Sequence, residues 1–282
     1  MSSELLNTPV DEGLTLENGS RSRNVRLLFI ADIVGQPGID ILTLALPNLI
    51  REQKPDLVIA KGENADNGRG MTVQQVNLFH EIGIDVITSG NHIWDKAPLR
   101  KEFKKLPNLL RPINYPPGSG GRGSVVVRTK SDIPIKVFNL QGRTFLPPID
   151  CPFRTMDSYL NKHEEDVKII FIDFHAETTA EKQAMGWYLD GKVSAIVGTH
   201  THVPTADERI LPKGTGYITD VGMTGSFDSV IGMETKVALR RFLTNTPQPF
   251  QVAEKNLHVC AVIVDVDKET GKCVSIERIN YS

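Results

Sequence analysis

The chain consists of short apolar runs that alternate with stretches of helical pattern, beginning near Arg26. Nearly continuous apolar runs of this length are typical of strands buried in a parallel sheet. Strands are predicted at 26–32, 56–63, 85–90, 123–128, 133–142, 167–175 and 193–200, and helices at 38–52, 72–83 and 179–191. Because proline lacks a backbone N–H and clashes with the preceding turn, Pro47 is expected to kink or restart the first helix.

The alternation of strand, helix and strand predicts an α/β fold with parallel strands. Near the C-terminus, two further strands are joined by a turn at 268–272. The simplest arrangement is a single mixed α/β domain over residues 25–282, in which two sheets pack together. A proline-rich loop at 143–153 lies between the two halves. Residues 1–24 are polar and acidic, and we expect a disordered leader there.

The amino-acid composition of the chain limits the kinds of molecule that it is expected to bind. The chain has 282 residues and a formal net charge of −2, which does not provide the broad basic field that binding of long duplex nucleic acid requires. Its three cysteines form no CxxC pair, so neither a disulfide framework nor a thiolate zinc site is expected, and a reducing cytoplasm fits. No apolar run reaches the roughly 20 residues of a membrane span. We therefore expect a cytoplasmic protein that does not contact the membrane.

Polar side chains lie at or just past the ends of five predicted strands: Asp32, Glu63, Asn91, His175 and His200. Ligands of open α/β sheets bind outside the carboxyl ends of the strands. One such residue alone would indicate a helix cap or a turn, but five of ligand type indicate a metal site. Nitrogen and oxygen ligands without thiolates suit manganese, iron, zinc or magnesium. The number of candidates favours two metal ions sharing a carboxylate.

Four short motifs and a histidine at a strand end resemble the calcineurin-type metallophosphoesterases: FIADIVG (29–35), GEN (62–64), GNH (90–92), His175 and GTHTH (198–202). The chain departs from that pattern twice. Val34 stands where a histidine ligand is usual, and Glu63 stands where an aspartate is usual. These departures, with GENADNGRG, GNHIWD and GRTFLPPIDCPF, resemble the YmdB-like branch of the superfamily.

The resemblance implies a four-layered αββα sandwich of two mixed sheets flanked by helices. It also implies the activity of the bacterial members of this branch, which are cytoplasmic phosphodiesterases that act on 2′,3′-cyclic nucleotides. It also implies two divalent metal ions, iron or manganese with zinc or magnesium as alternatives, and a catalytic role for His92. One ion would be held by Asp32, Glu63, Asn64 and His202. The other would be held by Glu63, Asn91, His175 and His200, so that Glu63 bridges the two.

The hypothesis from the sequence is hydrolysis of a phosphodiester by a metal-activated hydroxide, with His92 protonating the leaving group. Asp95 either orients the His92 imidazole or caps a helix. Arg69 and Arg143 are candidate contacts for the substrate phosphate, although a solvated arginine is the simpler interpretation of each.

Other interpretations of these residues stay open. For Asn64 and Asn91 the alternative is turn formation beside glycine, and for the GTHTH histidines it is an ordinary loop. The expected substrate is a small nucleotide or an RNA terminus. The competing functions are a phosphomonoesterase or protein phosphatase, and a nucleotide-binding regulator without catalysis. The sequence leaves the oligomeric state open.

Overall fold

The computed structural model describes residues 23–162 and 167–282, so most of the predicted leader, residues 1–22, lies outside the described residues. The described strands form two mixed sheets, one of seven strands and one of six. In the first, the order is β2-β11-β12-β1-β3-β4, with β13 paired to β12. In the second, it is β5-β6-β7-β8-β10-β9. The prediction of two sheets is confirmed.

The bounds of the strands follow the apolar runs closely. The first sheet contains β1 (Asn24–Ile30), β2 (Asp32–Ile33), β3 (Leu57–Lys61), β4 (Val86–Thr88), β11 (Met223–Ser226), β12 (Leu257–Asp267) and β13 (Cys273–Tyr281). The second contains β5 (Ser124–Arg128), β6 (Pro134–Gln141), β7 (Ile169–His175), β8 (Ala195–Thr199), β9 (Arg209–Ile210) and β10 (Gly216–Ile218). The pairs β1–β3–β4 and β6–β7–β8 are parallel, as the alternation of strands and helices predicts.

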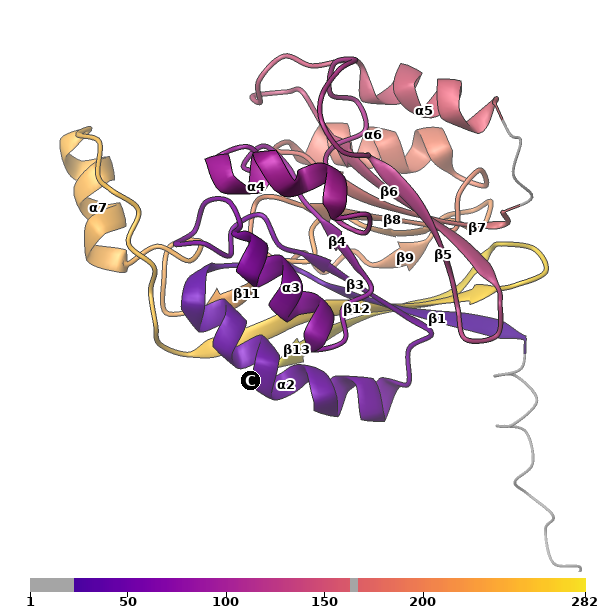
Figure 1. Ribbon diagram of the computed structural model, residues 1–282, viewed down its shortest axis with the longest axis horizontal. Helices are drawn as coiled ribbons and strands as arrows, with labels where there is room; N and C mark the ends of the chain where they lie inside the picture. Colours follow the sequence, from indigo (N-terminus) through magenta and orange to yellow (C-terminus); the bar gives the residue numbers. More distant parts are fainter. Residues whose placement is uncertain (1–22, 163–166) are drawn as a thin grey trace, which may run out of the picture.

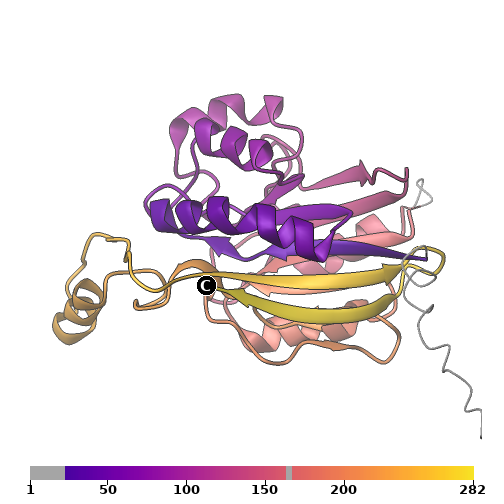
Figure 2. The same ribbon diagram turned by 90° about the horizontal axis from the view of Figure 1, so that it is seen from below.

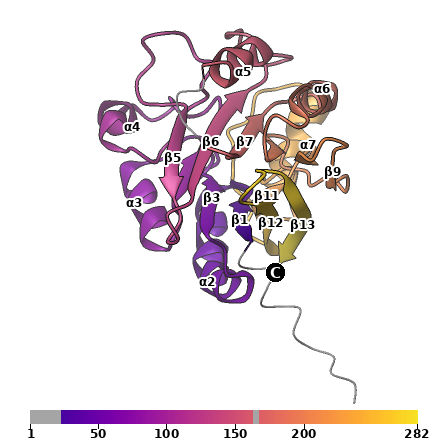
Figure 3. The same cartoon turned by 90° about the vertical axis from the view of Figure 1, so that its right-hand side faces the viewer.

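Six α-helices lie within the described chain, and four of them cover the outer faces of the sheets: α2 (Gly35–Gln53), α3 (Val73–Glu81), α5 (Pro152–Leu160) and α6 (Thr179–Leu189). One buried cluster joins α2 and α3 to the first sheet, and another joins α5 and α6 to the second. A third cluster, which includes Phe29 and Phe171, fills the space between the sheets. Figure 3 shows the resulting helix–sheet–sheet–helix layers, which confirm the predicted four-layered sandwich.

Two details differ from the sequence prediction. The predicted strand 26–32 is interrupted at Ala31, whose N–H donates to Cys260, and the chain then changes neighbour so that β2 pairs with β11. The helix α2 does not restart at Pro47 but runs continuously from Gly35 to Gln53. Ala45, Leu46 and Leu49 are buried on both sides of the proline, and this packing stabilises the continuous helix.

The sequence analysis assigned no helix to residues 152–160, of which only the first two belong to the proline-rich loop, and no element to residues 203–256. Helix α5 begins with Pro152 at its first position, where a proline without an N–H is well tolerated. The helix α7 (Thr235–Thr244) stands away from the rest of the molecule in Figures 1 and 2. The short helix α4 (Ala97–Glu102), followed by a 3₁₀ turn at Phe103–Lys105, is likewise an addition to the predicted elements.

Candidate metal centre

The predicted site residues come from both sheets and meet where the carboxyl ends of their strands face each other. Asp32 lies in β2, while Glu63 and Asn91 follow β3 and β4. From the second sheet, His175 ends β7 and His200 follows β8. A continuous series of contacts connects all seven predicted ligands, including Asn64 and His202. The site is therefore a seam between two sheets, not the rim of one.

One half of the seam is centred on Asp32, which is fully buried. Burial raises the pKa of its carboxyl group, although the nearby His202 opposes the rise. The Asn64 amide nitrogen donates to Asp32 Oδ1 at 3.1 Å and lies 3.0 Å from His202 Nε2. His202 Nδ1 donates to the Ile231 carbonyl at 2.9 Å, which leaves Nε2 with its lone pair toward Asp32 and Asn64. This is the usual orientation of a histidine that binds a metal.

The other half is centred on Glu63, which is also fully buried. Glu63 Oε1 lies 3.0 Å from His175 Nδ1. Neither atom has a hydrogen-bond partner among the described residues. His175 Nε2 lies 2.7 Å from the Asn91 amide oxygen, to which it donates, so Nδ1 carries the lone pair. Two acceptor atoms this close in a buried site need a shared proton or cation between them.

The charge states of these groups follow from their burial. Burial raises the pKa of Glu63 to about 8, with Lys61 acting against the rise. Burial lowers the pKa of His175 well below its ordinary value and that of His200 to about 3. The imidazoles of His175 and His200 are therefore neutral at physiological pH, as metal binding requires.

His200 joins the two halves of the seam. Its backbone N–H donates to Asp32 Oδ2 at 3.2 Å, and its ring lies 4.4 Å from the His175 ring, measured between centroids. His200 Nε2 lies 2.9 Å from a carboxylate oxygen of Glu177. Since the imidazole is neutral and Glu177 accepts from Nε2, Nδ1 is the free acceptor. The sequence analysis missed Glu177, which lies only two residues beyond His175.

Gly90 is necessary for this close packing. A Cβ atom at residue 90 would lie 2.4 Å from His175 Nδ1 and 2.5 Å from Glu63 Oε1. The glycine of the GNH motif therefore leaves open the space beside Glu63 Oε1 and His175 Nδ1.

His92 lies beside the seam with its imidazole held from one side. Its backbone N–H donates to Glu63 Oε2 at 2.8 Å, and its Nδ1 lies 3.0 Å from Asp95 Oδ2. Of the two interpretations of Asp95, the structure therefore supports orientation of the imidazole. Burial lowers the pKa of His92, and the Asp95 carboxylate opposes that shift. Nε2 is left for a substrate, with the Asn91 amide nitrogen 3.4 Å away.

The two candidate arginines lie in different surroundings. Arg69 lines the cavity at the seam and forms an ion pair with Asp95 at 3.3 Å. Arg143 is exposed and bonds through its backbone N–H to Glu181, and it is not among the residues that line the cavity. A contact between Arg143 and substrate stays a prediction.

The cavity at the seam has a volume of about 370 Å³ and two unlike walls. The metal-centre wall consists of Asn64, Gly68, Arg69, His92, His200 and His202. The opposite wall comes from a segment that we call the arm, residues 231–250, and consists of Ile231, Met233, Arg241, Gln248, Pro249 and Phe250. The arm was not predicted as part of the site.

The chemistry of the donor set suits divalent cations. It offers carboxylates, amide groups and neutral imidazoles, and the buried Glu63 and His175 present two acceptors that lack hydrogen-bond partners among the described residues. Within residues 23–162 and 167–282, no three His, Cys, Asp or Glu side chains already converge on one point with metal-binding spacing. Two of the seven candidate ligands, Asn64 and Asn91, are asparagines.

Comparison with known proteins agrees with the motifs. The model of the YmdB-like protein family matches residues 28–279. The chain belongs to the YmdB-like family. It is 49% identical over 255 residues to the 2′,3′-cyclic-nucleotide 2′-phosphodiesterase of Bacillus subtilis (strain 168), covering 90% of this chain and 96% of that protein. The predicted enzyme class, phosphodiester hydrolase, is confirmed by this similarity.

Two solved structures are similar to this YmdB-like chain. A hypothetical protein from Thermus thermophilus has a TM-score of 0.85 and 41% identity, covering 91% of this chain and 99% of that one. A novel phosphatase from Mycoplasma pneumoniae has a TM-score of 0.86 and 35% identity, covering 91% and 93%. None of the helices in the described part of this YmdB-like chain is long and apolar enough to cross a membrane.

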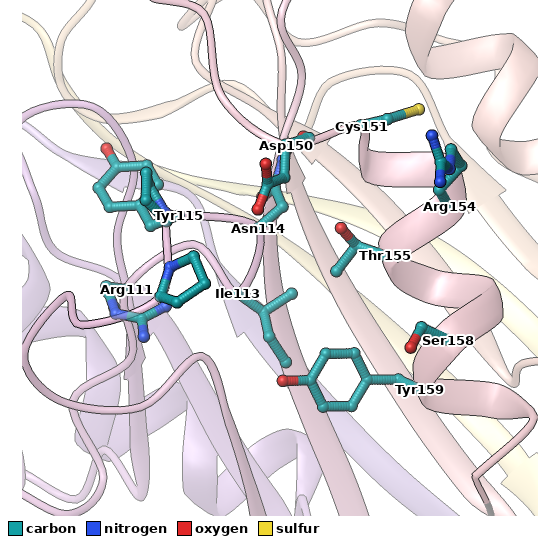
Figure 4. Close-up of a pocket in the computed structure, with 12 residues that line it drawn as sticks. Arg111, Ile113, Asn114, Tyr115, Asp150, Cys151, Arg154, Thr155, Ser158 and Tyr159 are labelled. Carbon is teal, nitrogen blue, oxygen red and sulfur yellow. Dashed lines mark hydrogen bonds between the residues drawn. The ribbon is translucent and has the colours of Figure 1, made fainter.

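A larger cavity, of about 570 Å³, lies between the 111–117 loop and α5. Figure 4 shows Arg111 and Tyr115 on one side of it and Thr155, Ser158 and Tyr159 on the other. The Tyr115 hydroxyl donates to the Gly90 carbonyl, so this cavity borders the metal centre without containing its candidate ligands. The proline-rich loop borders this second cavity, through Asp150 and Cys151, instead of the seam.

Proposed function

We propose that this protein is a dinuclear-metal-dependent phosphodiesterase that hydrolyses 2′,3′-cyclic nucleotides. The observation that carries the proposal is a pair of buried acceptors, Glu63 Oε1 and His175 Nδ1, which lie 3.0 Å apart at the centre of the candidate ligands and have no hydrogen-bond partners among the described residues. A buried pair of this kind suits a bound cation. The name of the Bacillus subtilis relative supports the choice of substrate class.

We assign Asp32, Glu63, Asn64 and His202 to one cation and Glu63, Asn91, His175 and His200 to the other. Two divalent cations at these residues would supply a nucleophile at neutral pH and neutralise the charge that develops on the phosphate. The neutral imidazoles and the buried carboxylates suit iron or manganese.

His92 would protonate the leaving alkoxide. Asp95 holds Nδ1 of the imidazole and opposes the fall in pKa that burial causes, and in its charged form the imidazole would present the Nε2 proton to the leaving group. The Glu63 carboxylate anchors the His92 backbone and thereby couples the position of the acid to that of the metal ligands.

We expect the substrate to be a phosphodiester and not a phosphomonoester, because the metal-centre wall has few cationic side chains without an acidic partner. A monoester carries an additional negative charge, but Arg69 on that wall is already paired with Asp95. The other cation in the cavity, Arg241, lies on the opposite wall.

The test is turnover of 2′,3′-cyclic AMP, a bis-p-nitrophenyl diester and a p-nitrophenyl monoester by protein loaded with manganese or iron. Turnover of both diesters with little turnover of the monoester is expected. Metal bound at about two ions per chain with no turnover of any substrate would contradict the proposal and favour a regulator.

The role of His92 is tested with His92→Ala in the same assays. We expect kcat to fall by about 10²- to 10⁴-fold, because the leaving group loses its acid, while metal content stays unchanged. His258→Ala is the matched control, since the His258 side chain, on β12, bonds to Asn256 and Asn280, away from the seam. A His92→Ala protein with wild-type kcat would show that another group protonates the leaving group.

A further inference from the structure

A buried ion pair lies beneath the GTHTH segment, outside the candidate ligand set. Lys182 Nζ, from α6, donates to Asp220 Oδ2 at 2.6 Å, and both side chains are 1% exposed. Removing two charges from water is costly, so a pair this deeply buried is weak evidence of a gain in stability. Its position beside the metal centre suggests a different role.

Asp220 holds Thr201, the residue between His200 and His202. Asp220 Oδ2 accepts from the Thr201 N–H at 3.2 Å and from the Thr201 hydroxyl at 2.8 Å. Its other oxygen accepts from the Gly222 N–H at 2.9 Å, so that both carboxylate oxygens are engaged. The Asp220 carboxylate is therefore fixed from three directions, by Lys182, Thr201 and Gly222.

The segment that Asp220 holds is conformationally strained. His200 has a φ of 98° and His202 a φ of 65°, in the region that side chains other than glycine rarely adopt. Such backbone conformations persist only where the surrounding structure enforces them, and they are concentrated at functional sites. The two contacts from Thr201 to Asp220 hold the residue between these strained histidines and thereby oppose relaxation of either to negative φ.

Close packing leaves little room for a different arrangement. The Val221 N–H donates to the Gly198 carbonyl at 3.0 Å. A Cβ atom at residue 198 would lie 1.7 Å from the Thr219 carbonyl oxygen and 3.1 Å from Lys182 Cδ. The glycine of GTHTH thus allows the Thr219–Val221 backbone, and with it Asp220, to approach the strand that leads into the histidines.

We propose that Asp220, anchored by Lys182, is a positioning residue that holds the His200–His202 segment in the strained conformation required to direct both imidazoles at the metal centre. This inference rests on the proposed function, because it concerns the same two metal sites. It adds a pair of residues that neither touch substrate nor bind metal.

The test measures the dissociation constant of manganese by competition with a chelator, together with the Tm of the metal-free protein. Thr201→Val removes only the hydroxyl that donates to Asp220, whereas Asp220→Asn removes the negative charge and one of the two acceptor oxygens of the carboxylate. We expect Asp220→Asn to weaken metal binding by about 10- to 100-fold, as loss of a group that orients metal ligands does. Thr201→Val should weaken it less, and Thr201→Ser, which keeps the hydroxyl, should restore wild-type binding.

Leu189→Ala is the control for general destabilisation, since Leu189 is a buried core residue of the same helix as Lys182. It should lower the Tm and leave the manganese dissociation constant unchanged. Should Asp220→Asn fail to fold, the comparison of Thr201→Val with Thr201→Ser still decides the question.

If wild-type protein binds manganese and Thr201→Val binds it equally tightly, the positioning role is overturned and the proposed function is not. Wild-type protein that binds no metal would overturn the proposed function, and the inference with it.

Discussion

At the residue scale, the site is defined by which ring nitrogens and carboxylate oxygens already form hydrogen bonds and which do not. Ile231 and Glu177 each engage one nitrogen of a histidine, leaving the other directed at the seam. Glu63 Oε1 and His175 Nδ1 are left without partners among the described residues. Since buried polar atoms in folded proteins nearly always have partners, this pair is the local feature that most supports the proposed cation.

The Gly90→Ala substitution tests this local geometry. The added methyl group would lie 2.5 Å from Glu63 Oε1 and must displace either that carboxylate or the His175 ring. Because small displacements of reacting groups have large effects on rate, we expect kcat/KM to fall by about 100-fold.

Gly120→Ala is the matched control, since the nearest atom to a Cβ there is 4.0 Å away, on Trp94. Steady-state kinetics with 2′,3′-cyclic AMP measures both variants. Wild-type activity in Gly90→Ala would mean that the space beside Glu63 and His175 is not used.

At the scale of elements, the arm gives the cavity its second wall. The main body of the protein supplies the candidate ligands, whereas the arm supplies apolar side chains, including Phe250, and the cation Arg241. In α7, Ala238 is buried while Phe242 and Leu243 are largely exposed. Ala238 and Arg241 are three residues apart and share one face of the helix. We therefore expect the arm to contact the part of a substrate that extends away from the reacting phosphate.

The Arg241→Gln substitution tests the contribution of the arm. Within the described chain, Arg241 has no carboxylate partner, so its charge is available to a ligand in the cavity. We expect KM for a 2′,3′-cyclic nucleotide to rise roughly tenfold, as loss of a charged hydrogen bond does, with little change in kcat.

Arg240→Gln on the same helix is the control, because Arg240 does not line the cavity. Equal kinetic constants in the two variants would show that the arm does not contact substrate through Arg241.

At the scale of the whole molecule, the site exists because the two sheets pack face to face with their parallel strands ending on the same side. A second buried ion pair spans the seam, since Lys61 of β3 lies 3.1 Å from Asp173 of β7 and 3.9 Å from Glu63. Lys61 also donates to the Ser89 carbonyl at 2.6 Å, beside the GNH motif. The candidate metal centre is thus tied to the packing of the sheets, and metal binding should stabilise the fold.

Removal of metal should lower the Tm accordingly. A ligand present at 100 times its dissociation constant stabilises the folded state by about 2.7 kcal/mol. For a chain of this size each kcal/mol corresponds to roughly 2–4 °C, so we expect the Tm to fall by about 5–10 °C when chelator is added. Differential scanning fluorimetry measures the shift, with chelator saturated with metal as the control. An unchanged Tm would indicate that the folded protein does not bind metal under these conditions.

The sequence by itself determined the strands that surround the site and the chemical types of the side chains at their ends. Continuous apolar runs are a local property, so the strands at 57–61, 169–175 and 195–199 were predicted to within two residues at each end. The departures from the usual metallophosphoesterase pattern, together with GENADNGRG, GNHIWD and GRTFLPPIDCPF, were sufficient to indicate the YmdB-like family. Helix α5 could have been found from Pro152 at its first position and the spacing of Met156 and Leu160.

Only the tertiary structure decided which residues support the site. The contacts that define it join residues 112 positions apart in Lys61 and Asp173, 138 in Asn64 and His202, and 168 in Asp32 and His200. Periodicity carries no information about such pairs, because it records which face of an element is buried and not what lies opposite. For the same reason Glu177, Lys182, Asp220 and the arm have no local signal that separates them from ordinary polar and surface residues. Their roles follow from the packing of two sheets whose strand ends meet.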